Sequence, residues 1–468
     1  MLNVRNKRCM LVVSSQQFNG TGGVGTSTYA LSRMLYEIGY AVDIVMDKRP
    51  NKVHKEYVDT MTSYCGLFYP EEALSTNNHL NTFAFRDSIP WEQLANFRQG
   101  LQSALKGRVY DLCIIQSTDA VGPVYHMELQ NYMTVVFYSH EYNSIFYANG
   151  SRDPVYNSAY RPWQKNMMTL PNLVIGTQTN ENVEKLKANG VLSAVCLPLP
   201  ITEPALFDSP KVEHNDKNGV LFIGRWEPRK DPKAYVKMIK ETNLPARVMT
   251  SIKSEDKFIE AFKEAGITDY VVKSNLRGQP KVDFIHSTRC CYMPSKEESY
   301  GLVVYEAVAS QPVITNKKYD WSKHHRWSEH YRVDSKDINN TIKLLYNSDR
   351  NSRGACILHE NSIKHIWDKL PLIKAKQNPN NFNKEATNGW VIDYNNNLDR
   401  RCTIEDSQAI HSSQNKYVFL HTKNNTWYTD SGIVPTEEPK HKNNSKINET
   451  FETFFDESIF IVNDADID

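Results

Sequence analysis

Residues 9–46 read CMLVVSSQQFNGTGGVGTSTYALSRMLYEIGYAVDIVM and contain one complete unit of an alternating α/β pattern. The apolar run 9–13 is typical of a buried parallel strand, and a glycine-rich turn follows it. Residues 27–39 place apolar side chains at helical spacing and end on Gly39, and a second apolar run covers 41–46. The stretch therefore predicts a strand, a helix and a second parallel strand.

The same alternation continues along the chain and then starts again. Further strands are predicted at 112–115, 134–138 and 173–176. A stretch rich in Pro, Asp and Lys, 198–218, interrupts the series, and new strands follow at 219–224, 246–249, 290–293 and 312–315. We therefore expect two doubly wound α/β domains, an N-terminal one over residues 1–205 and a C-terminal one over 206–375.

The composition changes to Asn-rich sequence over residues 376–468. Two short alternating segments, 416–420 and 426–429, predict a β-hairpin, and the end of the chain is acidic. We expect a small extension with β character, and the sequence assigns it no function.

Charge and apolar content exclude few classes of protein. The chain has 55 basic and 54 acidic residues, so net charge gives no support to a general polyanion-binding surface. Eight cysteines without a CxxC pair favour reduced thiols over a metal site. No apolar run approaches the roughly 20 residues of a membrane helix. We therefore expect a cytoplasmic protein without a membrane span or a structural metal.

The first candidate motif is the glycine-rich turn 20–25, which follows a strand and opens a helix. Gly22, Gly23 and Val24 would let the backbone approach a diphosphate or a sugar, and the helix start offers free N–H groups. No Gly-Lys-Ser/Thr follows, so the turn is not a P-loop. The alternative is a tight turn that only lacks side chains.

The second motif, residues 224–231, reads GRWEPRKD and follows the first strand of the second half. Arg225 or Arg229 can bond phosphate oxygens in pairs, and Lys230 adds a compact charge suited to a departing diphosphate. Its place at the carboxyl end of a strand is where open α/β sheets bind ligands. The alternative is a solvated basic loop.

The third motif, residues 298–306, reads ESYGLVVYE and is the most specific of the three. A helix that starts near Gly301 and Leu302 would point N–H groups at a phosphate. Glu298 and Glu306 can accept hydrogen bonds from hydroxyl groups at the two ends of a nucleotide sugar. Two solvated glutamates are the alternative, which the apolar flanks make weaker.

These three motifs, in this order, resemble the GT-B glycosyltransferases, especially the retaining group with a Glu-x7-Glu pattern, here Glu298 and Glu306. The resemblance covers about residues 9–345 and implies two facing Rossmann-like domains with a nucleotide sugar, a UDP-sugar, as co-substrate and no required divalent metal. It places the glycine-rich turn near the transferred sugar, Arg225 and Lys230 on the diphosphate, and Glu306 on the ribose. It also puts His140, which follows a strand, on the donor sugar; a core histidine is the alternative.

A narrower resemblance concerns the acceptor. The stretches 110–117 and 135–142, with Tyr305-Glu306-Ala307 leading to 312–314, look like phage DNA α-glucosyltransferases, which modify 5-hydroxymethylcytosine and so protect viral DNA. Those enzymes carry His-Asp where this chain has His140-Glu141. Glu141 would help position or deprotonate the acceptor hydroxyl. Double-stranded DNA with a modified base would then be the partner.

Residues 142–165 are aromatic and basic, a composition that can hold an extruded base by stacking or can serve ordinary interdomain packing. Two other readings of the chain remain open. One is the same chemistry on a glycan or lipid-linked acceptor, and the other is a non-catalytic DNA- or nucleotide-binding protein. The retention of Arg225, Lys230, Glu298 and Glu306 argues against the latter.

Overall fold

The first domain is built on a seven-stranded sheet in which every neighbouring pair is parallel, with the order β3-β2-β1-β5-β6-β7-β8. Its strands are β1 (Arg8–Val12), β2 (Ala41–Val45), β3 (Cys65–Phe68), β5 (Leu112–Ile115), β6 (Thr134–Tyr138), β7 (Leu173–Thr177) and β8 (Ala194–Cys196). The computed structural model describes residues 7–15, 18, 23–50, 55–73, 88–117, 120–127, 129–140, 172–188, 191, 193–210, 212–298 and 300–372, and four strands beyond residue 388.

Successive residues of a strand point to opposite faces of the sheet, and in these strands both sets of residues are apolar. Helices therefore cover both faces. Leu11 of β1 packs on the face covered by α2 (Gly23–Glu37) and α3 (Lys55–Thr62). Met10 packs on the opposite face, which is covered by α4 (Trp91–Leu105), α5 (Val121–His126) and α8 (Asn180–Ala188). The two-sided burial confirms the doubly wound arrangement that the apolar runs predict.

The second domain repeats the arrangement with a six-stranded parallel sheet, β11-β10-β9-β12-β13-β14. Its strands are β9 (Val220–Ile223), β10 (Ala246–Thr250), β11 (Tyr270–Ser274), β12 (Cys290–Met293), β13 (Val313–Asn316) and β14 (His330–Val333). One face packs against α10 (Pro232–Thr242), α11 (Ile252–Ala265) and α14 (Ile338–Leu345). The other face packs against α12 (Gly278–His286) and α13 (Leu302–Val308).

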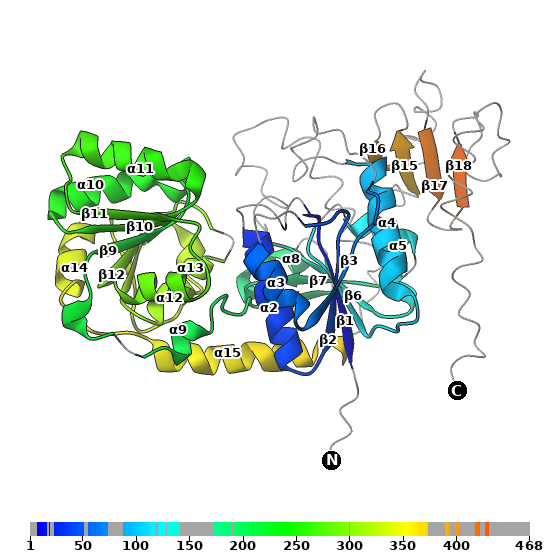
Figure 1. Ribbon diagram of the computed structural model, residues 1–468, viewed down its shortest axis with the longest axis horizontal. Coiled ribbons are helices and arrows are strands. Elements are labelled where there is room, and N and C mark those ends of the chain that lie inside the picture. Colours follow the sequence, from blue (N-terminus) through cyan, green and yellow to red (C-terminus); the bar gives the residue numbers. More distant parts are fainter. Residues whose placement is uncertain are drawn as a thin grey trace, which may run out of the picture.

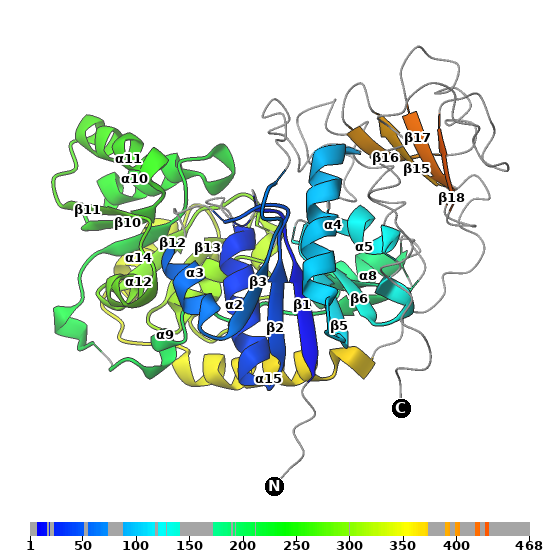
Figure 2. The same cartoon turned by 45° about the vertical axis from the view of Figure 1, so that its right-hand side comes forward.

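The chain passes between the domains twice (Figures 1 and 2). The first passage follows β8 and includes the short helix α9 (Ala205–Asp208). The second is α15 (Arg353–Asp368), which starts in the second domain and ends against the first sheet. Near its end the indole of Trp367 is fully buried and donates to the Pro198 carbonyl at 3.0 Å.

A third sheet is antiparallel and has the order β18-β17-β15-β16-β4. It joins β15 (Gly389–Asp393), β16 (Leu398–Cys402), β17 (Tyr417–His421) and β18 (Thr426–Thr429) to β4 (Ser88–Pro90) of the first half. The pairing of β17 with β18 confirms the predicted hairpin. The acidic end of the chain lies outside the described residues.

Candidate functional site

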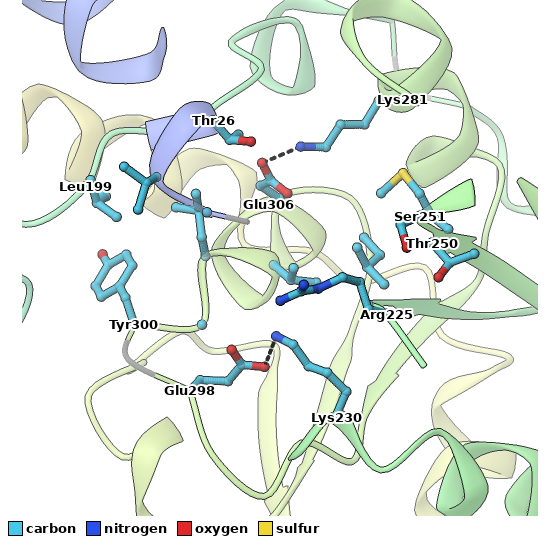
Figure 3. Close-up of a pocket in the computed structure, with 18 of the residues that line it drawn as sticks. Thr26, Leu199, Arg225, Lys230, Thr250, Ser251, Lys281, Glu298, Tyr300 and Glu306 are labelled. Atoms are coloured by element: carbon cyan, nitrogen blue, oxygen red, sulfur yellow. Dashed lines mark hydrogen bonds and ion pairs between the residues drawn. The ribbon is translucent and has the colours of Figure 1, made fainter. Parts of the chain in front are cut away.

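A cavity of about 330 Å³ lies between the two domains, at the carboxyl ends of both parallel sheets (Figure 3). Its walls come from the segments that follow β1, β6 and β7 in the first domain and β9, β10, β11 and β12 in the second. Both sheets reverse their chain order beside a central strand, β1 in one and β9 in the other. Ligands of open α/β sheets bind at such reversal points, so the topology explains why the cavity is here.

Nine of the predicted site residues line this single cavity although they are spread over almost 300 positions of the chain. They are Gly23, Val24, His140, Arg225, Lys230, Glu298, Gly301, Leu302 and Glu306. Gly22 and Glu141 lie outside the described residues, as do residues 142–165 with their aromatic and basic side chains.

The first domain contributes the start of α2, where the glycine-rich turn becomes helical. Gly23 and Val24 line the cavity together with Thr26. A Cβ on Gly23 would meet no atom within 4 Å, whereas one on Gly25 would collide with the backbone carbonyl of Phe18. Gly25 is therefore required for packing of the turn, and Gly23 leaves open space on the cavity side.

His140 follows β6 and reaches the cavity from the first domain. Its Nε2 lies 3.2 Å from Oε1 of Gln116, and its ring meets the ring of Tyr138 edge-on with 4.8 Å between centroids. Burial lowers the pKa of His140 to about 3, so the imidazole is neutral at physiological pH. A neutral imidazole with so low a pKa is a weak base and is suited to orienting a ligand by hydrogen bonds.

The second domain contributes three cations directly after β9, namely Arg225, Arg229 and Lys230. Lys230 ends a single 3-10 turn, Pro228–Lys230, and its ammonium group pairs with the carboxylate of Glu298. Arg225 pairs with Glu227 at 2.9 Å and keeps about a third of its side chain exposed. Figure 3 shows the Arg225 guanidinium in the middle of the cavity, between the Lys230–Glu298 pair and Glu306. The Lys and Arg side chains that line the cavity, over the described residues, thus all come from the second domain.

Glu306 is the centre of a buried polar network (Figure 3). Its Oε1 accepts a hydrogen bond from Nζ of Lys281 at 2.7 Å and another from the hydroxyl of Thr202. Lys281 also donates to Thr202 at 2.9 Å. Both contacts engage Oε1, so among the described residues Oε2 is left to accept hydrogen bonds from a ligand.

Gly301 and Leu302 mark the start of α13, where the third motif predicts a helix. Gly301 has φ +72°, and a Cβ there would lie 2.6 Å from the ring of Trp321. The helix is only seven residues long, and Glu306 lies in its second turn.

Several lining residues have no counterpart in the sequence motifs. Lys281 from α12 is the partner of Glu306, and Arg277 precedes it in the loop after β11. Thr250 is the last residue of β10, and its buried hydroxyl has no hydrogen-bond partner in the part of the chain that the structure describes. Strand β11 was not recognised from the sequence. Had it been, Arg277 and Lys281 would have stood out as cations that follow the carboxyl end of a strand of the parallel sheet.

Over the described ranges, no three His, Cys, Asp or Glu side chains form a group that could hold a metal ion. None of the helices that the structure describes combines the length and apolar content of a membrane span.

No protein-family model matches this sequence, and no curated protein matches it significantly. Solved structures do. The match to the crystal structure of TarM has a TM-score of 0.59 at 12% identity and covers 79% of this chain and 100% of that one. Anabaena Alr3699/HepE, in complex with UDP and glucose, matches with a TM-score of 0.56 at 11% identity, over 78% of this chain and 100% of that one. Sucrose-phosphate synthase from Thermosynechococcus elongatus matches with a TM-score of 0.53 at 13% identity, over 78% and 96%. The chain therefore has the two-domain GT-B fold.

Proposed function

We propose that this protein is a glycosyltransferase that takes a sugar from a nucleotide-sugar donor, a UDP-sugar, bound in the interdomain cavity. The observation that carries the proposal is the convergence of Arg225 and Lys230 with the buried carboxylate of Glu306 on one cavity whose walls come from both domains. Cations suit a diphosphate and a fixed carboxylate suits vicinal hydroxyls. The volume lies at the lower end of the range for small-molecule sites, about 300–1,000 Å³.

Each lining residue then has a role that follows from its chemistry. Arg225 offers a planar fork of donors to phosphate oxygens. Lys230 has three N–H donors, so it can bond Glu298 and still face the diphosphate. Glu306 holds the ribose hydroxyls through Oε2, while Lys281 and Thr202 fix its Oε1.

In the proposed reaction the bond between the sugar C1 and the diphosphate oxygen breaks, and the nucleoside diphosphate leaves with the electron pair. The acceptor oxygen forms the new bond to C1 on the same face, which retains the configuration, and its proton passes to the departing phosphate. Arg225 and Lys230 stabilise the negative charge that develops on the leaving group. His140, neutral at physiological pH, orients the sugar hydroxyls.

For the acceptor we propose a hydroxymethylated pyrimidine in double-stranded DNA, modified in the cytoplasm of the host cell of a phage. The support is the sequence pattern around His140 and Glu141, with the aromatic and basic residues 142–165 as candidates to hold an extruded base. A glycan acceptor is the alternative, and one TarM variant has been solved with fondaparinux, α-GlcNAc-glycerol and UDP.

The test is nucleotide release from a panel of UDP-sugars, with and without DNA that contains hydroxymethylcytosine. We expect DNA-stimulated release, and we expect Glu306→Ala and Lys230→Ala each to lower kcat/KM about 100-fold or more, because each removes a charged contact to the donor. Lys237→Ala is the matched control, since Lys237 is an exposed lysine of the same domain.

The outcomes separate the parts of the proposal. Release from a UDP-sugar that DNA does not change would move the acceptor to a glycan or a small molecule. Absence of binding and release with every nucleotide sugar would contradict the glycosyltransferase assignment itself.

A further inference from the structure

A second cavity, of about 240 Å³, lies where the linker, the second domain and the start of α15 meet. Of the described residues, none lines both this cavity and the interdomain cavity. Its lining residues are Val212, Lys217, His286, Ala309, Ser310, Asn351 and Arg353. In Figures 1 and 2, α9, α12 and the first turns of α15 come together at the lower edge of the second domain.

The electrostatic character of this second cavity is positive. Lys217 and Arg353 both line it, and none of the described residues that line it is acidic. The Lys217 side chain is almost fully buried; its Nζ donates to the Ser310 carbonyl at 3.0 Å and lies 3.8 Å from the carboxylate of Asp349. After burial, the charges of Arg353 and Lys217 are the largest causes that lower the pKa of His286. The cationic field therefore reaches the ring of His286.

Two buried polar atoms in the same wall have no hydrogen-bond partner within the described residues. They are Nε2 of His286 and the hydroxyl of Ser310, and each residue is only 4% exposed. A buried polar atom without a partner costs about 1–3 kcal/mol, so such atoms are rare unless a ligand or water satisfies them. Here both line a cavity that also holds two cations.

We propose that this second cavity binds a small anion of the phosphate class. The Ser310 hydroxyl can donate to a phosphate oxygen, and Nε2 of His286 can accept from a P–OH group or, when protonated, donate to an oxygen. Lys217 and Arg353 compensate the charge, and Asn351 adds an amide. A tetrahedral anion that both donates and accepts matches polar groups which arrive from four separate segments of the chain.

The location gives such an anion a structural role. Arg353 is the first residue of α15, and its guanidinium donates to the carbonyls of Phe207, in α9, and Ser209, the latter at 2.7 Å. An anion beside Arg353 would therefore connect both interdomain passages to the ends of α12 and α13. Binding to the folded state also stabilises the protein by mass action.

The test is calorimetric titration of inorganic phosphate into the full chain, at constant ionic strength set with chloride. We expect a site in the second cavity whose dissociation constant rises about tenfold or more in Ser310→Ala and in Lys217→Met, since each removes a bond to a charged ligand. Lys230→Met, which removes a cation from the interdomain cavity instead, should leave this site unchanged. Phosphate should also raise the thermal unfolding midpoint of the wild type and of Lys230→Met, but not of Ser310→Ala.

Ser310→Ala keeps the test decisive if Lys217→Met does not fold, because it deletes only a hydroxyl that has no hydrogen-bond partner among the described residues. Two results would overturn the proposal. One is that wild type shows no phosphate binding beyond the effect of chloride. The other is that Lys230→Met abolishes the binding while Ser310→Ala leaves it intact, which would place the anion in the interdomain cavity.

Discussion

Gly301 is a position at which a single missing side chain shapes the site. Both Gly301 and Gly266 have φ +72°, but a Cβ on Gly266 would meet no atom within 4 Å. The Trp321 ring that a Cβ on Gly301 would strike is held by a hydrogen bond from its Nε1 to the Ser295 carbonyl at 2.7 Å. Substituting Gly266 therefore introduces backbone strain alone, whereas substituting Gly301 adds a steric collision to the same strain.

We expect Gly266→Ala to cost about 1 kcal/mol of the free energy of unfolding, from the left-handed backbone alone. Gly301→Ala should cost about 1–3 kcal/mol more, because the ring must move. Urea unfolding of the two variants measures the difference. Equal losses of the free energy of unfolding in the two variants would show that the Trp321 ring moves aside without a measurable energetic penalty.

His140 predicts a pH dependence of stability. Burial lowers its folded-state pKa from the usual 6.5 to about 3, so the unfolded chain takes up this proton first as the pH falls. His140 therefore lowers the free energy of unfolding progressively below about pH 6.5, by about 1.4 kcal/mol per pH unit at most. His140→Gln should show a shallower loss of stability between pH 6.5 and 4.5.

The measurement is the urea midpoint at several pH values, with His365→Gln as the control because His365 is exposed. Other histidines also titrate in this range, so the contribution of His140 is the difference in the pH dependence of the urea midpoint between His140→Gln and the wild type. Parallel curves for His140→Gln and the wild type would contradict the lowered pKa of this ring.

Helices α12 and α13 are joined by the pair of Lys281 and Glu306, whose side chains are 9% and 3% exposed. Removing one partner of a buried pair leaves an uncompensated charge, which costs about 3–5 kcal/mol. We expect Lys281→Met to lose about this much of the free energy of unfolding. The double variant Lys281→Met/Glu306→Gln should lose less than Lys281→Met alone.

A double-mutant cycle in urea measures the coupling between the two side chains. Lys237→Met tests the opposite case, because the Lys237–Glu241 pair on α10 is exposed and 3.7 Å long, and it should change stability by no more than about 0.5 kcal/mol. Additive losses in the buried pair would mean that Lys281 does not compensate the charge of Glu306.

Which elements could be predicted from sequence depends on where they lie in each sheet. The central strands β1, β5, β9 and β12 are buried on both faces, so continuous apolar runs identify them. The edge strands β11 and β14 are only half-buried and mix polar with apolar residues, so no run identifies them. Because β11 was not predicted, the loop that follows it was not examined for site residues. Arg277 and Lys281, which line the cavity, were therefore not predicted either.

The candidate site was more predictable than the network around it. Arg225, Lys230, Glu298 and Glu306 belong to compact motifs at strand ends, where the topology of a parallel sheet brings them together. The partners of Glu306 could not be predicted, since Thr202 lies 104 positions away and meets it only through the passage of the chain between domains. Contacts of this kind depend on how the two domains pack against each other, and a local sequence pattern does not indicate that packing.

The return of α15 to the first sheet makes the connection between the domains double. Lys364 pairs with Glu37 of α2 at 2.7 Å, and Glu360 accepts a hydrogen bond from the Ile201 backbone at 3.0 Å, so the helix is attached along its length. Because two segments cross between the domains, we expect twisting of one domain against the other to be hindered and bending about the line that joins the two segments to be the easier motion. A protease that cut either tether alone would leave two fragments still associated through the other.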